Sequence, residues 1–165
     1  MRTFKIERIG IFAIISISII LRLISIITTS GAFKFISPLN ESLWEHMKVM
    51  FFSGFIFMII EIFLKVSENK NFFIAKFFSL ISLTFSIPML YYTYSSFIGK
   101  SVPFINLIID ICAATISQYV SYKILNRSEA VPLINQVASI CAIFLNVFIL
   151  VYFSFNPLNT QIFAS

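Results

Sequence analysis

The segment SPLNESLWEHMK, residues 37–48, contains two carboxylates and the only histidine of the chain. If the segment is helical, Glu41 and Glu45 lie one turn apart on one stripe of the helix, and His46 lies on the neighbouring stripe. Carboxylate oxygens and an imidazole are ligands that several divalent cations accept. We therefore expect these three residues to bind a divalent metal ion. Asp110, from a later segment, completes the predicted catalytic group.

Two other interpretations of the same segment remain open. In the first, His46 acts as a general base toward water or toward the hydroxyl of Ser42. In the second, the polar residues only cap a helix at the membrane surface, so that Glu45 pairs with Lys48 and Trp44 anchors among the lipid headgroups. The HExxH motif of zinc hydrolases is absent from the sequence, and the pattern alone does not choose between these interpretations.

Three ionisable residues fall inside long apolar runs: Arg22, Glu61 and Asp110. A charge near the centre of a bilayer costs about 2.5–3.5 kcal/mol, so each of them needs a partner or a hydrated cavity. Arg22 and Asp110 are matched in depth, roughly 12 Å below the same surface at 1.5 Å per residue. This match predicts an ion pair that fixes helix packing, lines a polar cavity, or does both. Glu61 lies near the opposite surface and is expected to extend toward Lys65, one turn away.

Other polar residues are candidates for binding a ligand. Arg22 and Lys48 are the cations placed to bind an anionic headgroup. Tyr92 and Asn106 are expected at a similar depth and could hydrogen-bond the same ligand, although an aromatic belt at the membrane surface also accounts for the tyrosine. Four amides within apolar runs are expected to hydrogen-bond between helices: Gln118, Asn135, Gln136 and Asn146.

The composition requires a membrane environment for these candidates. Of the 165 residues, 59% are hydrophobic and 12% are charged, whereas soluble domains contain about 45–50% apolar and about 25% charged residues. The net charge of +5 is scattered between apolar runs, which argues against a nucleic-acid partner and for the lipid bilayer. Cys112 and Cys141 both lie in apolar runs, and we expect them to be small buried fillers.

The apolar runs predict an all-α bundle of about five transmembrane helices in a single domain, residues 1–165. The first run is too long for the apolar core of a cleaved signal peptide. The second helix is expected to begin with Ser37 as N-cap and Pro38 in its first turn. Pro88 should kink the third. The expected spans cover residues 9–30, 42–66, 72–94, 102–124 and 131–153.

Lysine and arginine residues in the loops predict the orientation of the bundle. Loops on the N-terminal side carry most of them, and Lys34, Lys48 and Lys100 lie on the other side. The positive-inside rule then places the N-terminus in the cytoplasm and the C-terminus outside. The polar segment 37–48 is therefore expected to face away from the cytoplasm. The cations assigned to the inner side are Arg2, Lys5, Arg8, Lys65, Lys70, Lys76, Lys123 and Arg127.

Several motifs together resemble those of a family of small bacterial multi-pass membrane proteins of unknown function. They are SPLNESLWEHMK, the later YYTY, the IDI around Asp110, YVSYKIL, and a tail with Pro157. The resemblance covers most of the chain after the first apolar run, and it implies residence in the bacterial plasma membrane without naming a reaction. The signature of that family is Pro-x-Asn-Glu-Ser-x-Trp-Glu-His-x-Lys, which corresponds here to Pro38, Asn40, Glu41, Ser42, Trp44, Glu45, His46 and Lys48.

Three functions remain open at this point. The first is a membrane-embedded, metal-assisted hydrolase that acts on a lipid or a small amphiphile from the outer leaflet. The second is a protein that binds or transports a small solute in the same cavity. The third is a structural or accessory subunit whose polar groups only fix helix packing.

Overall fold

The computed structural model describes residues 2–27, 33–99 and 103–163, and this part of the chain is helical without any β-strand. Each predicted span corresponds to one long helix. Lys100 and the predicted span ends near residues 28–30 and 102 lie outside the described residues. The helices are α1 (Arg2–Ile27), α2 (Leu43–Phe63), α3 (Phe72–Ile98), α4 (Pro103–Leu125) and α5 (Leu133–Phe155), with short 3-10 helices η1 (Phe33–Phe35), η2 (Val66–Glu68) and η3 (Gln161–Phe163).

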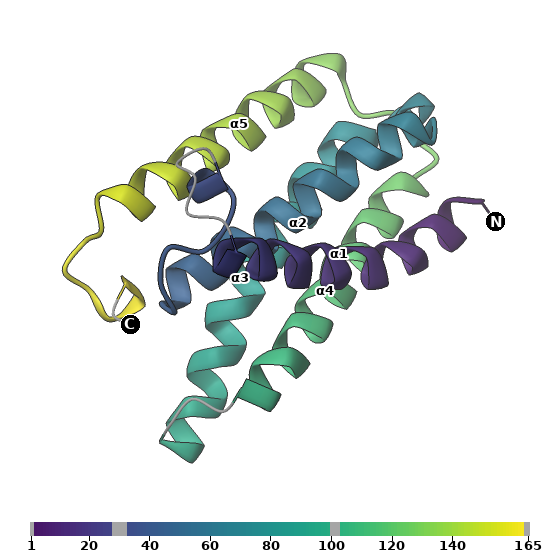
Figure 1. Cartoon of the computed structure of the whole chain (residues 1–165). Helices are drawn as coiled ribbons and strands as arrows, with labels where there is room; N and C mark the ends of the chain where they lie inside the picture. Colours follow the sequence, from purple (N-terminus) through teal and green to yellow (C-terminus); the bar gives the residue numbers. More distant parts are fainter. Residues whose placement is uncertain (1, 28–32, 100–102, 164–165) are drawn as a thin grey trace.

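Four of the five helices enclose the core, and the fifth lies at the edge (Figure 1). Helices α3 and α4 run side by side, α1 packs against α2 and α4, and α2 packs against α3. Helix α5 contacts α3 and, less extensively, α2. The centre of the bundle is apolar, since Ile14, Met50, Phe57, Leu83 and Ile87 are buried together there.

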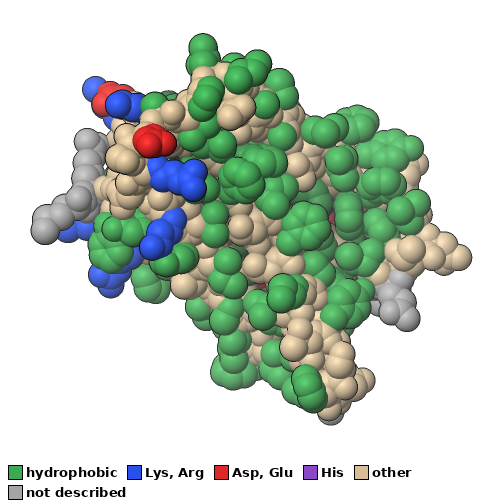
Figure 2. Space-filling view, turned by 180° about the vertical axis from the view of Figure 1, so that it is seen from behind, with side chains coloured by type: hydrophobic (Ala, Val, Ile, Leu, Met, Phe, Trp, Pro, Cys, Tyr) green, Lys and Arg blue, Asp and Glu red, His purple; other side chains and the backbone are tan. Residues whose placement is uncertain are grey.

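Large hydrophobic side chains also cover much of the outer surface of the bundle (Figure 2). All five helices are long and apolar enough to cross a membrane. Large hydrophobic side chains such as Phe12, Phe85 and Phe144 are exposed. Figure 2 shows hydrophobic side chains over most of one face, with charged side chains gathered at the end that holds the N-terminus. Cys112 and Cys141 are exposed on this surface, so the prediction that they are buried was wrong.

The start of α2 differs from the sequence prediction. The helix begins at Leu43 with Ser42 as its N-cap, and the Ser42 hydroxyl accepts the backbone N–H of Glu45 at 3.4 Å. The Ser42 N–H in turn donates to Oδ1 of Asn40 at 3.0 Å, which closes a turn directly before the helix. Ser37, the predicted cap, instead donates its hydroxyl to the carbonyl of Phe33 at 2.7 Å. The sequence contains two serines that could cap this helix, and the later one is the cap, with its own N–H held by Asn40.

Side-chain hydrogen bonds attach α5 to the rest of the bundle. Gln136 accepts the N–H of Ile74 at 3.1 Å and donates to the carbonyl of Lys70 at 2.8 Å, which confirms its predicted role between helices. Asn146 donates within its own helix instead. Trp44 donates its indole N–H to the carbonyl of Leu150 at 3.2 Å. Trp44, which one interpretation predicted to anchor among the lipid headgroups, therefore belongs to the contact between α2 and α5.

Gly10 marks the closest approach of α1 to its neighbours, and it provides a test of this packing. A Cβ at this position would lie 2.5 Å from Cε1 of Phe57 and 2.6 Å from Oε1 of Gln118. We expect Gly10→Ala to force α1 away from α2 and α4 at a cost of about 1–3 kcal/mol. Thermal unfolding in detergent, followed by circular dichroism, should show a lower midpoint. Ser16→Ala, at an exposed position of α1, should leave the midpoint unchanged, and equal midpoints for both variants would contradict the packing.

Candidate functional site

Three helices each contribute one side chain to a chain of contacts between ionisable groups. Nε2 of His46, from α2, contacts Oδ1 of Asp110, from α4. The other carboxylate oxygen, Oδ2, lies 3.6 Å from Nη2 of Arg22, from α1. The Asp110 side chain is 8% exposed and that of His46 is 12% exposed, whereas that of Arg22 is 39% exposed. The predicted pair of Arg22 and Asp110 is confirmed, and His46 extends it.

Asp110 determines which nitrogen of His46 is available. Because the carboxylate occupies Nε2, the Nδ1 atom is the one that remains for another partner. No hydrogen bond to Nδ1 is present among the described residues. A carboxylate that orients an imidazole in this way is a common arrangement for general acid–base catalysis. Asp110 therefore orients the ring of His46, and Nδ1 is the ring atom that this contact leaves open.

Glu45 and Lys48 form a second, separate pair at the start of α2. Nζ of Lys48 lies 2.6 Å from Oε2 of Glu45, as the sequence predicted. The same oxygen accepts the backbone N–H of Leu39 at 3.0 Å, and Nζ also donates to the carbonyl of Lys34 at 3.4 Å. The Lys48 side chain is fully buried. The pair thus fastens the preceding loop to the helix, and the structure does not present Lys48 to a ligand.

An open pocket of about 530 Å³ lies beside His46 and Arg22. Asn106 lines it, as predicted, and also accepts the hydroxyl of Tyr94 at 2.8 Å. The carboxylate of Glu41 lines the mouth and is exposed, without an ion pair among the described residues. Tyr92 is exposed and is not among the described lining residues. The pocket is lined by Arg22, Ser25, Ile26, Pro38, Leu39, Asn40, Glu41, Ser42, Glu45, His46, Val49 and Asn106.

The predicted metal ligands do not converge. Glu41 precedes the helix, Glu45 is bound to Lys48, and Nε2 of His46 is bound to Asp110. Among the described residues, no three His, Cys, Asp or Glu side chains form a group that could hold a metal ion. The Glu45–Lys48 pair agrees with the capping interpretation, and the contact with Asp110 leaves His46 for the interpretation in which it acts as a general base on water or a hydroxyl.

A second cluster of buried charges lies at the other end of the same helices. Nζ of Lys76, from α3, lies 2.6 Å from Oε1 of Glu61 and 2.8 Å from Oε1 of Glu7. Glu61 is fully buried, so the prediction that it extends toward Lys65 was wrong. A charged side chain that far inside the bundle needs an opposite charge, and Lys65 is exposed on the loop after α2.

Sequence reasoning missed the burial of Glu7, which it placed before the first span, and of Lys76, which it counted only as an inner-side cation at the start of the third span. The described part of α1 starts at Arg2, seven residues before the predicted span, so Glu7 lies within the helix. A signal for its burial was present, because Glu7, Gly10 and Ile14 fall on one stripe at helical spacing. All three are buried.

The buried pair of Glu45 and Lys48 provides a test of this local structure. Removing one charge leaves the other without a partner, and we expect Lys48→Met to destabilise the protein by about 3–5 kcal/mol. The double variant Glu45→Gln, Lys48→Met should recover most of that loss. Lys70→Met, at an exposed position, is the matched control and should have little effect. Thermal unfolding in detergent measures these three variants, the single variant Glu45→Gln and the wild type, and a loss in the double variant equal to the sum of the two single losses would argue against the pair.

No curated protein and no solved structure matches this chain. A family of unknown function, DUF6512, matches residues 2–165. The match covers the five helices together with both polar clusters. The chain therefore belongs to the DUF6512 family of unknown function.

Proposed function

We propose that this protein is a multi-pass enzyme of the bacterial plasma membrane, with its N-terminus in the cytoplasm and the pocket beside His46 open to the outer side. The apolar outer surface supports membrane insertion. The distribution of loop cations supports the orientation. Lys48 and Lys76 no longer count toward it because both are buried in ion pairs, one on each side. Without these two lysines, the loops on the N-terminal side still carry more lysine and arginine residues than those on the other side.

The proposed reaction is hydrolysis of an ester or phosphoester bond in a lipid or small amphiphile. The observation that supports it most directly is the chain of contacts from Arg22 through Asp110 to His46 at the wall of an open pocket. Such a pocket at the end of a membrane bundle admits water and lets an amphiphile keep its tails in lipid. In this proposal His46 is the general base and Asp110 orients its ring, and neither role requires a bound metal ion.

The chemical step uses water as the nucleophile. Nδ1 of His46 takes a proton from the water while its oxygen attacks the carbonyl carbon or phosphorus of the substrate. The bond to the alcohol leaving group then breaks, and the leaving oxygen receives that proton from His46. Asp110 holds the ring through Nε2 and balances the positive charge that forms on it. The products are an acid and an alcohol, and His46 returns to its starting state.

Charged groups at the pocket suggest which headgroups fit. Arg22 lines it with a side chain that is 39% exposed and carries a guanidinium, a group that binds anions. Glu41 at the mouth can accept a hydroxyl or an ammonium group. We therefore propose a headgroup that carries an anionic group together with a hydrogen-bond donor.

Solute binding with transport is the second candidate. It is supported by the buried charges at the far end of the same helices, because a hydrolase confined to one surface does not require them. A purely structural role is less well supported. It predicts that every buried polar atom is paired, whereas Glu7, Arg22, Glu61 and Gln118 each have a buried atom without a hydrogen bond among the described residues.

Catalysis is tested with the purified protein in nanodiscs of phosphatidylglycerol and phosphatidylethanolamine, with p-nitrophenyl butyrate and bis(p-nitrophenyl) phosphate as soluble probes. Mass spectrometry follows the lipids, and absorbance follows nitrophenol release. We expect His46→Gln to lower the rate by about 100-fold or more and Asp110→Asn to lower it as well. Ser96→Ala, exposed on α3, should retain the wild-type rate. Wild-type protein that releases no product above empty nanodiscs would overturn the assignment as a hydrolase.

Orientation is tested by labelling one engineered cysteine in intact cells. Leu39→Cys, in a background of Cys112→Ser and Cys141→Ser, places a thiol at the pocket. A membrane-impermeant maleimide added to intact cells should label it. Lys70→Cys, on the loop before α3 at the opposite end, should react only after lysis. The reverse pattern would place the pocket on the cytoplasmic side.

A further inference from the structure

Four buried side chains from four helices meet at the N-terminal end of the bundle. Lys76 donates to Oε1 of Glu7 at 2.8 Å, to Oε1 of Glu61 at 2.6 Å and to the hydroxyl of Ser121 at 2.8 Å. Ser121 donates to the same oxygen of Glu7, also at 2.8 Å. Each of the four residues is at most 3% exposed. We call Glu7, Glu61, Lys76 and Ser121 the buried quartet.

The charges of the buried quartet do not balance if both carboxyl groups are ionised. Two carboxylates then share one ammonium, which leaves one negative charge in an apolar surrounding, and a buried unpaired charge is strongly unfavourable. Arg8 is the nearest cation at the adjoining pocket, but its guanidinium lies over the ring of Phe4 at 5.6 Å and makes no ion pair among the described residues. One further positive charge is needed at this site.

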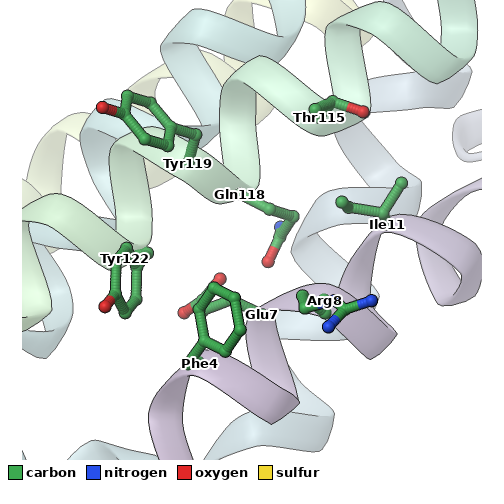
Figure 3. A pocket seen from close by; sticks show the side chains of 8 residues that line it. All are labelled: Phe4, Glu7, Arg8, Ile11, Thr115, Gln118, Tyr119 and Tyr122. Atoms are coloured by element: carbon green, nitrogen blue, oxygen red, sulfur yellow. The ribbon is translucent and has the colours of Figure 1, made fainter.

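Three acceptor oxygens at this end are buried and lack a hydrogen-bond donor among the described residues: Oε2 of Glu7, Oε2 of Glu61 and Oε1 of Gln118. Gln118 and Glu7 line the same pocket, and Gln118 is 4% exposed. In Figure 3 the amide oxygen of Gln118 is turned toward the carboxyl group of Glu7. Two acceptors that face each other are unfavourable without a donor between them, which a proton on Glu7 or the amide N–H of a turned Gln118 would supply.

We infer that the buried quartet is a binding site for one proton, held by the carboxyl groups of Glu7 and Glu61. A proton there neutralises the excess charge, and on Glu7 it also supplies a donor for Gln118. An alkali cation would need more oxygen ligands than the three unpaired ones, since both Oε1 atoms are already bound to Lys76.

The proton enters from the N-terminal side of the bundle. A pocket of about 170 Å³ reaches Glu7 between α1 and α4. Its other ionisable linings are Arg8, Tyr119 and Tyr122. From α2 and α3 the groups that face the site are Glu61 and Lys76 themselves. Toward the other end, the apolar core around Ile14 and Phe57 separates the site from His46. The inference is therefore independent of the proposed hydrolysis.

Infrared difference spectroscopy tests the site in the full-length protein in nanodiscs. A protonated carboxyl group has a C=O stretching band that a carboxylate lacks, and this band shifts in D2O. We expect the wild-type protein to show one protonated carboxyl per chain at neutral pH, and the band to disappear when the medium becomes sufficiently alkaline. Glu7→Gln and Glu61→Gln should each abolish the band, because one carboxylate then balances Lys76.

Two controls keep the result specific. Glu68→Gln removes an exposed carboxylate of η2 and should leave the band unchanged. Lys76→Met removes the ammonium, so both carboxyl groups should become protonated and the band should double. If either glutamine variant fails to fold, the wild-type band and its increase in Lys76→Met still decide the question.

The inference is overturned if the wild-type protein has no such band at neutral pH, or if the band survives in both Glu7→Gln and Glu61→Gln. A band that disappears when sodium replaces potassium at constant pH would show that sodium displaces the proton, and it would overturn the assignment of the site to a proton alone. Hydrolysis assays on the same proteins distinguish the two proposals, since a wild-type protein that hydrolyses the probes but shows no band overturns this inference alone.

Discussion

A charge between apolar helices must be neutralised by a neighbour, and this requirement determines how the bundle is assembled. Asp110 joins α4 to α1 through Arg22 and to α2 through His46. At the other end, Lys76 joins α3 to α1 and α2 through two glutamates. Each end of the four-helix core is thus fixed by contacts that apolar packing alone would not specify, because lipid and core are equally apolar. Helix α5 contributes no ionised side chain to either cluster, and it lies at the edge.

The two polar clusters are separated by the apolar centre of the bundle. Ile14, Leu83 and Ile87 are completely buried in this layer, and Ala113 and Ala114 allow α4 to pack closely against it. One cluster is open to a large pocket, whereas the other is enclosed except for a small one. The same helices therefore present two different electrostatic environments, one suited to a ligand and one suited to a small positive charge.

The sequence predicted what depends on local patterns. Hydrophobic runs located five helices because each run is long enough to cross a bilayer. Arg22 and Asp110 lie at the same predicted depth below one membrane surface, and this match predicted their ion pair. The spacing of Glu45 and Lys48 along one helix predicted theirs in the capping interpretation. These contacts require only the position of each residue within its own span or helix.

Contacts between distant segments were not predictable in the same way. Glu7 and Lys76 are 69 positions apart, and in the sequence each resembled an ordinary charge near the end of an apolar run. The contact of His46 with Asp110 was likewise not visible, since it depends on how α2 and α4 face each other. The prediction of where α2 begins failed for a different reason. Two serines could cap the helix, and the later one, Ser42, is the cap, with its backbone N–H bonded to Oδ1 of Asn40.

The buried ammonium of Lys76 has a consequence for biogenesis. If the helices insert into a membrane as proposed, the ribosome delivers α1 and α2 before it has made α3, so both glutamates reach the bilayer ahead of Lys76. Lys76 follows Glu61 by just 15 positions, which means that α2 and α3 can enter together as a hairpin that already carries its counter-charge. The nascent α1, in contrast, must wait beside the translocon, or cross with its acidic group neutral, until that hairpin arrives.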